Sequence, residues 1–282
     1  MHIRGIELIF LGLALLAGPR LARADDEAGA AHLGARRIDR TAYTLDQRQV
    51  DIGVESIEAA PFDELTIGTY VPTWLLFPYL GTPVPTGFIK ARTPFFGPVA
   101  ASLRVNAIYL SGASLRSELA GANSANGSLW IVPAELAVSV NPAPHWSESI
   151  ELMYVAVSGK GNADGNATIR GSAAATSFTL SSFTEFRLSS TFALTLLGRL
   201  LVHQDAAAVQ GSASSEGTRV DFDLGVRRRN PLVACIVPGL QLDADRLHVD
   251  LGLGYGSFWL PILELPLAAY GPVPETNLYM RF

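Results

Sequence analysis

The sequence predicts an all-β fold, an antiparallel transmembrane β-barrel of about 12 strands, with about 10 as the alternative count. Apolar and polar residues alternate with a period of two along much of the chain, as they do in a strand with two unlike faces. The composition is 49% hydrophobic and 17% charged, yet the apolar residues are dispersed rather than gathered into a run of membrane-helix length. The chain also ends on an alternating strand.

That final strand covers residues 276–282 and is the clearest in the sequence. Leu278, Met280 and Phe282 fall on one side of an extended segment, polar residues fall on the other, and the chain stops on the aromatic residue. A closed membrane barrel has to end on a strand that pairs with an earlier one and shows lipid an apolar face. The ending therefore predicts the closing strand of a barrel.

This ending resembles the C-terminal signal of bacterial outer-membrane β-barrel proteins, in which a terminal Phe after alternating apolar residues is read by the barrel assembly machinery. Residues 41–45, leading into 50–54, and residues 251–261 are also similar to segments of uncharacterised Gram-negative outer-membrane barrels. The resemblance implies a location in the Gram-negative outer membrane, with the lipids of that membrane as partners. It also implies that the assembly machinery recognises Phe282.

The N-terminal region predicts export. Residues 1–24 have a charged start at Arg4, an apolar run over 6–17 and a small-residue end at 22–24, which together predict a signal peptide cleaved before Asp25. The apolar run is shorter than the roughly 20 residues of a spanning helix. Residues 25–40 have no period and are predicted to form a flexible periplasmic arm, and residues 41–282 the barrel.

The remaining strands follow in order along the chain. Alternation predicts strands at residues 50–55, 64–71, 99–107, 135–140, 150–156, 178–188, 192–203, 219–227 and 247–255. Residues 231–243 fit either a strand or a long connection. Short turns are expected near Pro61, Pro98, Pro142, Ser189 and Asn230, and long outer connections at 72–86, 111–127, 158–171, 204–217 and 258–274. A soluble β-sandwich also alternates, but its outward face is polar, whereas one face of these strands is almost wholly apolar.

The charged residues of these strands share the face that a barrel turns inward. One interpretation is a water-filled channel whose acidic and basic side chains select solutes. The other is that the charges pair across a narrow lumen and hold it shut. The candidate lining residues are Glu64, Arg104, Glu135, Glu151, Arg187, Arg199, Arg219, Asp221, Asp223, Arg227, His248, Asp250 and Arg281.

Two long connections are unusually apolar and carry aromatic residues. They belong either to an aromatic girdle at the membrane surface or to a hydrophobic cap folded over the lumen, and a cap would favour an apolar solute. The aromatic candidates are Trp74, Phe77, Tyr79, Phe258 and Trp259.

The run Gly252-Leu253-Gly254-Tyr255-Gly256 has a GxGxG spacing, but no helix start follows it, so it is not a nucleotide loop. Its glycines share the inward face. They either leave a bare stripe of wall, with space for an inserted loop or a ligand, or relieve bending at a strongly coiled strand.

Composition and spacing exclude several function classes. The formal net charge is −5, so no nucleic-acid partner is expected, because phosphate binding needs a basic face. The single cysteine, Cys235, cannot form an internal disulfide and is expected to be a small buried residue. No His or Cys spacing typical of metal sites occurs, so no metal or cofactor is expected.

The sequence therefore predicts a porin-like barrel without enzymatic activity, acting as a channel or passive transporter for small-molecule solutes, apolar ones among them. The alternative is a structural or surface-recognition barrel with a plugged lumen. An outer-membrane lipid hydrolase is less favoured, because His203 and His248 fall on inward positions and no Ser is singled out by its spacing. No catalytic residue is assigned.

Overall fold

The structure is a computed structural model that describes residues 39–75, 84–111, 122–165, 168–205, 208–215, 218–225, 233–260 and 265–282. It is built from one antiparallel sheet and a single short described helix. The elements are β1 (Val50–Gly53), β2 (Ser56–Phe62), β3 (Leu65–Tyr70), α3 (Val71–Leu75), β4 (Thr86–Arg92), β5 (Val99–Ser111), β6 (Ala122–Ala143), β7 (Trp146–Gly165), β8 (Thr168–Arg187), β9 (Phe192–Gln204), β10 (Ala208–Ser215), β11 (Thr218–Gly225), β12 (Ala234–Ala244), β13 (Leu247–Leu260) and β14 (Leu265–Arg281).

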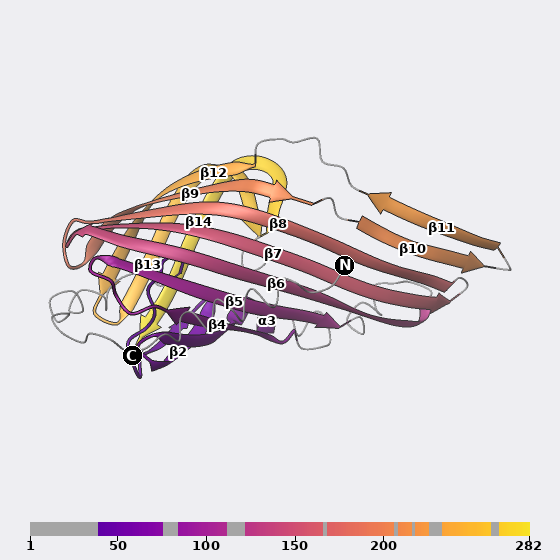
Figure 1. Ribbon diagram of the computed structural model, residues 1–282, viewed down its shortest axis with the longest axis horizontal. Coiled ribbons are helices and arrows are strands. Elements are labelled where there is room, and N and C mark those ends of the chain that lie inside the picture. The colour runs from indigo at the N-terminus through magenta and orange to yellow at the C-terminus, as the bar shows by residue number, and fades with distance from the viewer. Residues whose placement is uncertain are drawn as a thin grey trace.

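Twelve of these strands close into a barrel (Figure 1). Strands β1 to β9 pair in sequence order, β9 pairs with β12, and β12, β13 and β14 lead back to β1. The hairpin β10–β11 stays outside this ring and pairs with the start of β8, over residues 168–174. The predicted fold class and strand number are confirmed.

Each wall strand has a polar inner face and an apolar outer face. On β7, Ser149, Glu151 and Met153 are buried, whereas Ile150 and Leu152 between them are 61% and 42% exposed. Buried carboxylates beside exposed aliphatic side chains invert the pattern of a water-soluble sheet and match a barrel surrounded by lipid. The described residues contain no helix that is both long and apolar enough to cross a membrane.

The apolar band on the outer surface has the height of a bilayer core. Trp146, next to the β6–β7 turn, marks one edge of the band, which we call the lower edge. Trp130, which pairs with Ser158, marks the opposite, upper edge. From Trp146 to Ser158, β7 rises about 30 Å along the barrel axis at roughly 3.3 Å per residue and a tilt of roughly 40°, which matches a hydrocarbon thickness of about 30 Å. Glu148 lies on this face near the lower edge, where Trp146 Nε1 donates a hydrogen bond of 2.8 Å to its carboxylate.

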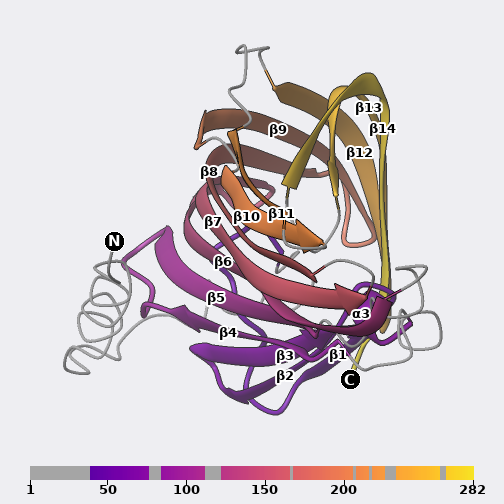
Figure 2. The same cartoon turned by 90° about the vertical axis from the view of Figure 1, so that its right-hand side faces the viewer.

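The two ends of the barrel differ. One end carries the short turns at residues 63–64, 144–145, 188–191 and 245–246 together with Phe282, and is called the turn rim below. The opposite end, the loop rim, is uneven, because β1 to β4 have 4, 7, 6 and 7 residues and β6, β7 and β8 have 22, 20 and 20. The long strands and the β10–β11 hairpin project beyond the rest of the wall as an extension (Figures 1 and 2).

Four predicted outer connections are wrong in whole or in part. One is 258–274, because β13 reaches Leu260 and β14 begins at Leu265; the other three lie in the extension. Residues 158–171 and much of 204–217 and 111–127 were expected to be outer connections, but β7, β8, β10 and β6 run through them. The expectation was wrong because these segments are rich in Gly, Ala, Ser and Asn and lack the apolar alternation that marks a lipid-facing strand. Beyond the bilayer a strand no longer needs an apolar outer face. The short turn expected near Asn230 lies outside the described residues.

Candidate functional site

The lumen is the candidate functional site, and its turn-rim half is filled by paired charges. The register of the β1–β14 seam places Asp51 opposite Arg281, and the guanidinium donates two hydrogen bonds to the carboxylate, of 2.9 and 2.8 Å. Both side chains are less than one-tenth exposed. The strands that close the barrel are therefore joined by a buried bidentate ion pair.

A second ion-pair network joins β8, β12 and β13. Arg187 contacts Glu185 at 2.7 Å and Asp243 at 2.9 Å. Asp243 also lies 2.7 Å from Nδ1 of His248, whose ring stacks on Tyr279 with a centroid separation of 4.7 Å. Of the strands that carry this network, β12 and β13 lie across the ring from β4 and β5 (Figure 2).

A third network surrounds Arg104 on β5. Its guanidinium donates hydrogen bonds to Asp39 at 3.0 Å and to the Tyr70 hydroxyl at 2.9 Å, and lies 3.9 Å from Glu135. It also lies 3.9 Å from the centroid of the Phe88 ring, a cation–π contact. Because Asp39 precedes the first strand, this arginine ties the N-terminal part of the described chain to the barrel wall.

Residues 39–45, called the plug segment below, lie inside the lumen. Arg40 forms an ion pair with Glu275 on β14. On the opposite side, Lys90 on β4 donates a hydrogen bond of 2.8 Å to the Thr41 carbonyl, and Ser139 on β6 accepts one of 2.7 Å from the Ala42 amide. The segment therefore crosses the lumen from one wall to the other.

The C-terminal half of the plug segment is held equally closely. The Tyr43 hydroxyl donates to Asn141 at 2.6 Å, and the Leu45 amide donates to the Thr66 hydroxyl at 3.1 Å. Leu45 is 1% exposed. The last two residues of the expected periplasmic arm, Asp39 and Arg40, thus belong to the filled lumen. Of the two interpretations of the inward charges, this geometry corresponds to pairing that holds the lumen shut.

The lumen becomes apolar farther from the turn rim. Phe183 lies farther from that rim than Glu185 on β8, and Ile108 lies farther than Arg104 on β5. On β9 one charge enters this layer, because Arg199 lies beyond Leu197, 5.8 Å from the centroid of the Trp259 ring. Two clusters form this layer, one containing Phe183, Leu197, Val233, Cys235, Val237, Trp259 and Val273, and the other Val84, Ile108, Ile131, Met153 and Val155. The site thus has an apolar layer above a polar floor.

Most of the predicted lining residues are on the inner wall. Those on ring strands with buried or half-buried side chains are Arg104, Glu135, Glu151, Arg187, Arg199, His248, Asp250 and Arg281. They were predicted correctly because alternation shows which face of a strand is polar, and that face lines the lumen.

Five predicted lining residues are not on the described wall. Glu64 is exposed in the β2–β3 turn. Arg219, Asp221 and Asp223 belong to β11, outside the ring, and Asp221 is exposed. These predictions were wrong because a projecting hairpin and a wall strand share the same alternation. Arg227 lies outside the described residues.

The aromatic candidates lie in different parts of the structure. Trp74 is 61% exposed on α3, where its indole Nε1 donates to Thr69 at 3.1 Å. Trp259 is 4% exposed within the apolar layer of the lumen, and Phe258 packs against the same cluster. Phe77 and Tyr79 lie outside the described residues.

The glycines of β13 do not leave an empty stripe. A Cβ on Gly254 would lie 1.9 Å from the Ile236 carbonyl oxygen, and one on Gly252 would lie 2.9 Å from Val237. Gly256 has φ +143, a conformation that side chains rarely adopt. Glycine is needed here because β12 and β13 approach closely, so the expectation of free space is wrong.

Several charged residues of the filled lumen were not predicted, among them Asp39, Lys90 and Asp243. Lys90 alternates with the apolar Ile89 and Ala91, and Asp243 shares the parity of Gln241 just before the turn at 245–246, so both had a local signal. Asp39 had none, because no strand pattern includes it.

The two histidines do not form a hydrolytic site in the described part of the chain. His248 is buried and paired with Asp243, and neither its ring nor that of His203 is hydrogen-bonded to a serine there. The expected inward position of His203 is wrong, because a bulge between Phe178 and Thr179 leaves it exposed. Hydrogen bonds from Thr176 and His203 hold the pKa of Asp205 below its usual value at the loop rim.

A scan against protein-family models finds no match for this chain, and neither does a search of curated proteins. Among solved structures, the CymD monoaromatic hydrocarbon channel is similar at 10% identity and a TM-score of 0.35, over 84% of this chain and 88% of that one. CdiB from Acinetobacter baumannii is similar at 13% identity and a TM-score of 0.28, over 83% of this chain and 59% of that one. Because both scores are low, the assignment rests on strand pairing and sidedness, by which the chain is a closed, membrane-embedded antiparallel β-barrel.

Proposed function

We propose that this protein is a Gram-negative outer-membrane barrel that passes small molecules, apolar ones among them, and that the plug segment closes its route at the turn rim. The observation that carries the proposal is the layered lumen, with an apolar layer next to a floor made of one short segment and paired charges. A purely structural barrel has no need of two different layers.

The apolar layer favours an apolar solute. Phe183, Trp259 and Met153 present aromatic and thioether surfaces to the interior rather than to lipid. Such surfaces gain free energy when they contact apolar groups, at about 25 cal/mol per Å² removed from water. A small apolar molecule that passes this layer would remain in contact with apolar side chains, whereas an ion would lose its hydration there.

The plug segment is held less firmly than the strands of the wall are. In the described structure residues 39–45 belong to no strand, so their contacts are individual hydrogen bonds and ion pairs rather than a ladder. A typical hydrogen bond contributes about 1 kcal/mol net. Withdrawing the segment therefore costs less than opening the barrel wall, which is held by continuous strand pairing.

The test is to weaken the plug without touching the wall. The double variant Asp39→Ala/Arg40→Ala removes both ion pairs, to Arg104 and Glu275, and we expect it to raise the open fraction about tenfold for each 1.4 kcal/mol lost. The measurements are conductance in planar bilayers and uptake of a small aromatic hydrocarbon by liposomes.

The control is Asp46→Ala/Arg48→Ala, which removes the same two charge types from exposed positions just after the plug segment. It should behave as the unaltered protein does. If the folded plug variant neither conducts nor takes up the hydrocarbon, the alternative of a structural or surface-recognition barrel is favoured instead.

We also propose that Phe282 is the signal read by the barrel assembly machinery. Its backbone is paired with Val50 in both directions, at 2.9 and 3.0 Å, and its ring is 52% exposed on the outer face. Phe282→Ala keeps that pairing, so spontaneous folding into lipid vesicles should be unchanged while the amount assembled in cells falls severalfold. Phe192→Ala, a comparably exposed ring on the same rim, should leave cellular assembly normal.

A further inference from the structure

The outer face of the extension changes character just beyond the apolar band. Side chains alternate between the two faces of a strand, so Lys160 lies on the same face of β7 as Ile150 and Leu152, and Arg170 lies on the same face of β8 as Leu180. Both cations therefore belong to the lipid-facing side of the wall. Both are exposed. The same face that presents aliphatic side chains to lipid thus becomes basic where the band ends.

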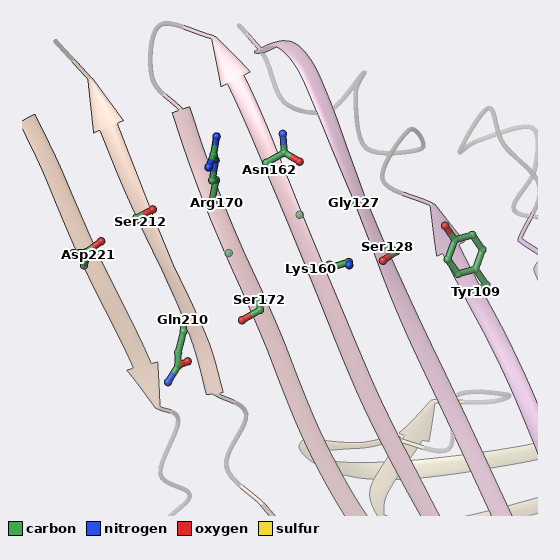
Figure 3. A pocket seen from close by; sticks show the side chains of 12 residues that line it. Tyr109, Gly127, Ser128, Lys160, Asn162, Arg170, Ser172, Gln210, Ser212 and Asp221 are labelled. Carbon is green, nitrogen blue, oxygen red and sulfur yellow. The ribbon is translucent and has the colours of Figure 1, made fainter. Parts of the chain in front are cut away.

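The strand register gathers these cations with neutral polar residues. Ser128 pairs with Lys160, Lys160 with Ser172, and Ser172 with Gln210, which makes one polar row across four strands. In the next row Asn162 pairs with Arg170. We call these six residues the polar shelf. Their side chains line an open cavity of about 870 Å³ together with Tyr109 (Figure 3).

Lys160 lies at the height of the headgroup layer of a bilayer, and Arg170 lies just above that layer, where its long side chain can reach down to it. Trp130, which packs on Tyr109 with ring centroids 4.6 Å apart, pairs with Ser158 and marks the upper edge of the apolar band. Lys160 follows about 5 Å higher and the row of Arg170 about 10 Å higher, at roughly 3.3 Å per residue and a tilt of roughly 40°. Headgroups and their interface extend about 5 to 8 Å beyond the hydrocarbon on each side.

The charge of the polar shelf is open to an external partner. Within the described part of the chain, neither Lys160 nor Arg170 takes part in an ion pair. Among the described residues that line the cavity, Asp221 is the one acidic residue, and its Cα lies two strands from that of Arg170, about 10 Å away by strand spacing. Two cations with adjacent hydroxyl and amide groups suit an anion with several acceptor oxygens.

We infer that the polar shelf binds the phosphate-bearing headgroup of an anionic lipid in the leaflet that meets the loop rim. The acyl chains of that lipid lie along the apolar band below Trp130 while Lys160 and Arg170 contact the phosphate. The site is independent of whether the lumen passes a solute.

Native mass spectrometry of the detergent-solubilised protein tests this inference, with phosphatidic acid as the probe and phosphatidylcholine as the zwitterionic comparison. Lys160→Gln/Arg170→Gln should weaken phosphatidic acid binding about 30-fold, since each basic residue near a membrane surface contributes about fivefold. The matched control is Arg48→Gln/Arg246→Gln, which removes two exposed cations at the turn rim and should not weaken binding.

The folded state of each variant is checked first by its resistance to SDS before heating. Equal binding of the two lipids, or equal weakening by the two double variants, would overturn the inference. Displacement of the lipid by millimolar inorganic phosphate would overturn it too, because the site would then be one for a free anion.

Discussion

Arg281→Ala is expected to destabilise the barrel by about 3–5 kcal/mol, the usual cost of leaving one partner of a buried ion pair behind. The destabilisation concerns the seam, where β1 and β14 share a short ladder of three residue pairs at 51, 52 and 53 of β1, extended by the backbone hydrogen bonds between Val50 and Phe282. Asp51 also pairs across β1–β2 with Glu58, which is buried, so two carboxyl groups would face each other without the guanidinium. Urea unfolding in lipid vesicles, followed by tryptophan fluorescence, measures the change.

The double variant Asp51→Asn/Arg281→Gln separates the ion pair from the packing of its side chains. It removes both charges and keeps most of the volume, so we expect it to lose clearly less stability than Arg281→Ala. A loss below about 1 kcal/mol for Arg281→Ala would show that the seam is closed by the backbone alone.

Gly254→Ala is expected to cost about 3 kcal/mol or to prevent β12 from pairing with β13. The added Cβ would lie 1.9 Å from the Ile236 carbonyl oxygen, and a backbone atom cannot move aside as the end of a side chain can. Gly271→Ala on the neighbouring strand is the matched control, because its Cβ would meet nothing within 4 Å. Equal unfolding free energies for the two variants would contradict the close approach of β12 and β13.

The fold was predictable because lipid imposes a rule on every wall strand. Alternation in segments such as 150–156 and 247–255 shows which side chains meet lipid, and the strand that ends at Phe282 shows that the sheet closes. The rule applies only to the parts of a strand that lie within the bilayer. Residues 158–171 were therefore mistaken for a loop, and the strand of residues 219–227 for part of the wall, although β11 is free of the bilayer constraint.

The site was predictable in part for the same reason. The alternation of side chains along each strand places Arg104, Arg187 and Arg281 on the inner face, but it does not give their partners. Asp243 lies 56 positions from Arg187, and only the order of β8, β9 and β12 around the ring brings them together. The plug segment had no periodic signal at all, because its conformation is set by the wall that surrounds it.

The unequal wall has a consequence for the surrounding membrane. Strands β2 to β4, with 6 or 7 residues each, reach only about 18 Å along the axis at roughly 3.3 Å per residue and a tilt of roughly 40°, some 10 Å less than the opposite side. Their outer face is still aliphatic, with Ile57, Ile67 and Ile89 each at least 40% exposed. We expect acyl chains beside these strands to compress, so the bilayer should be thinner on this side of the protein than on the other.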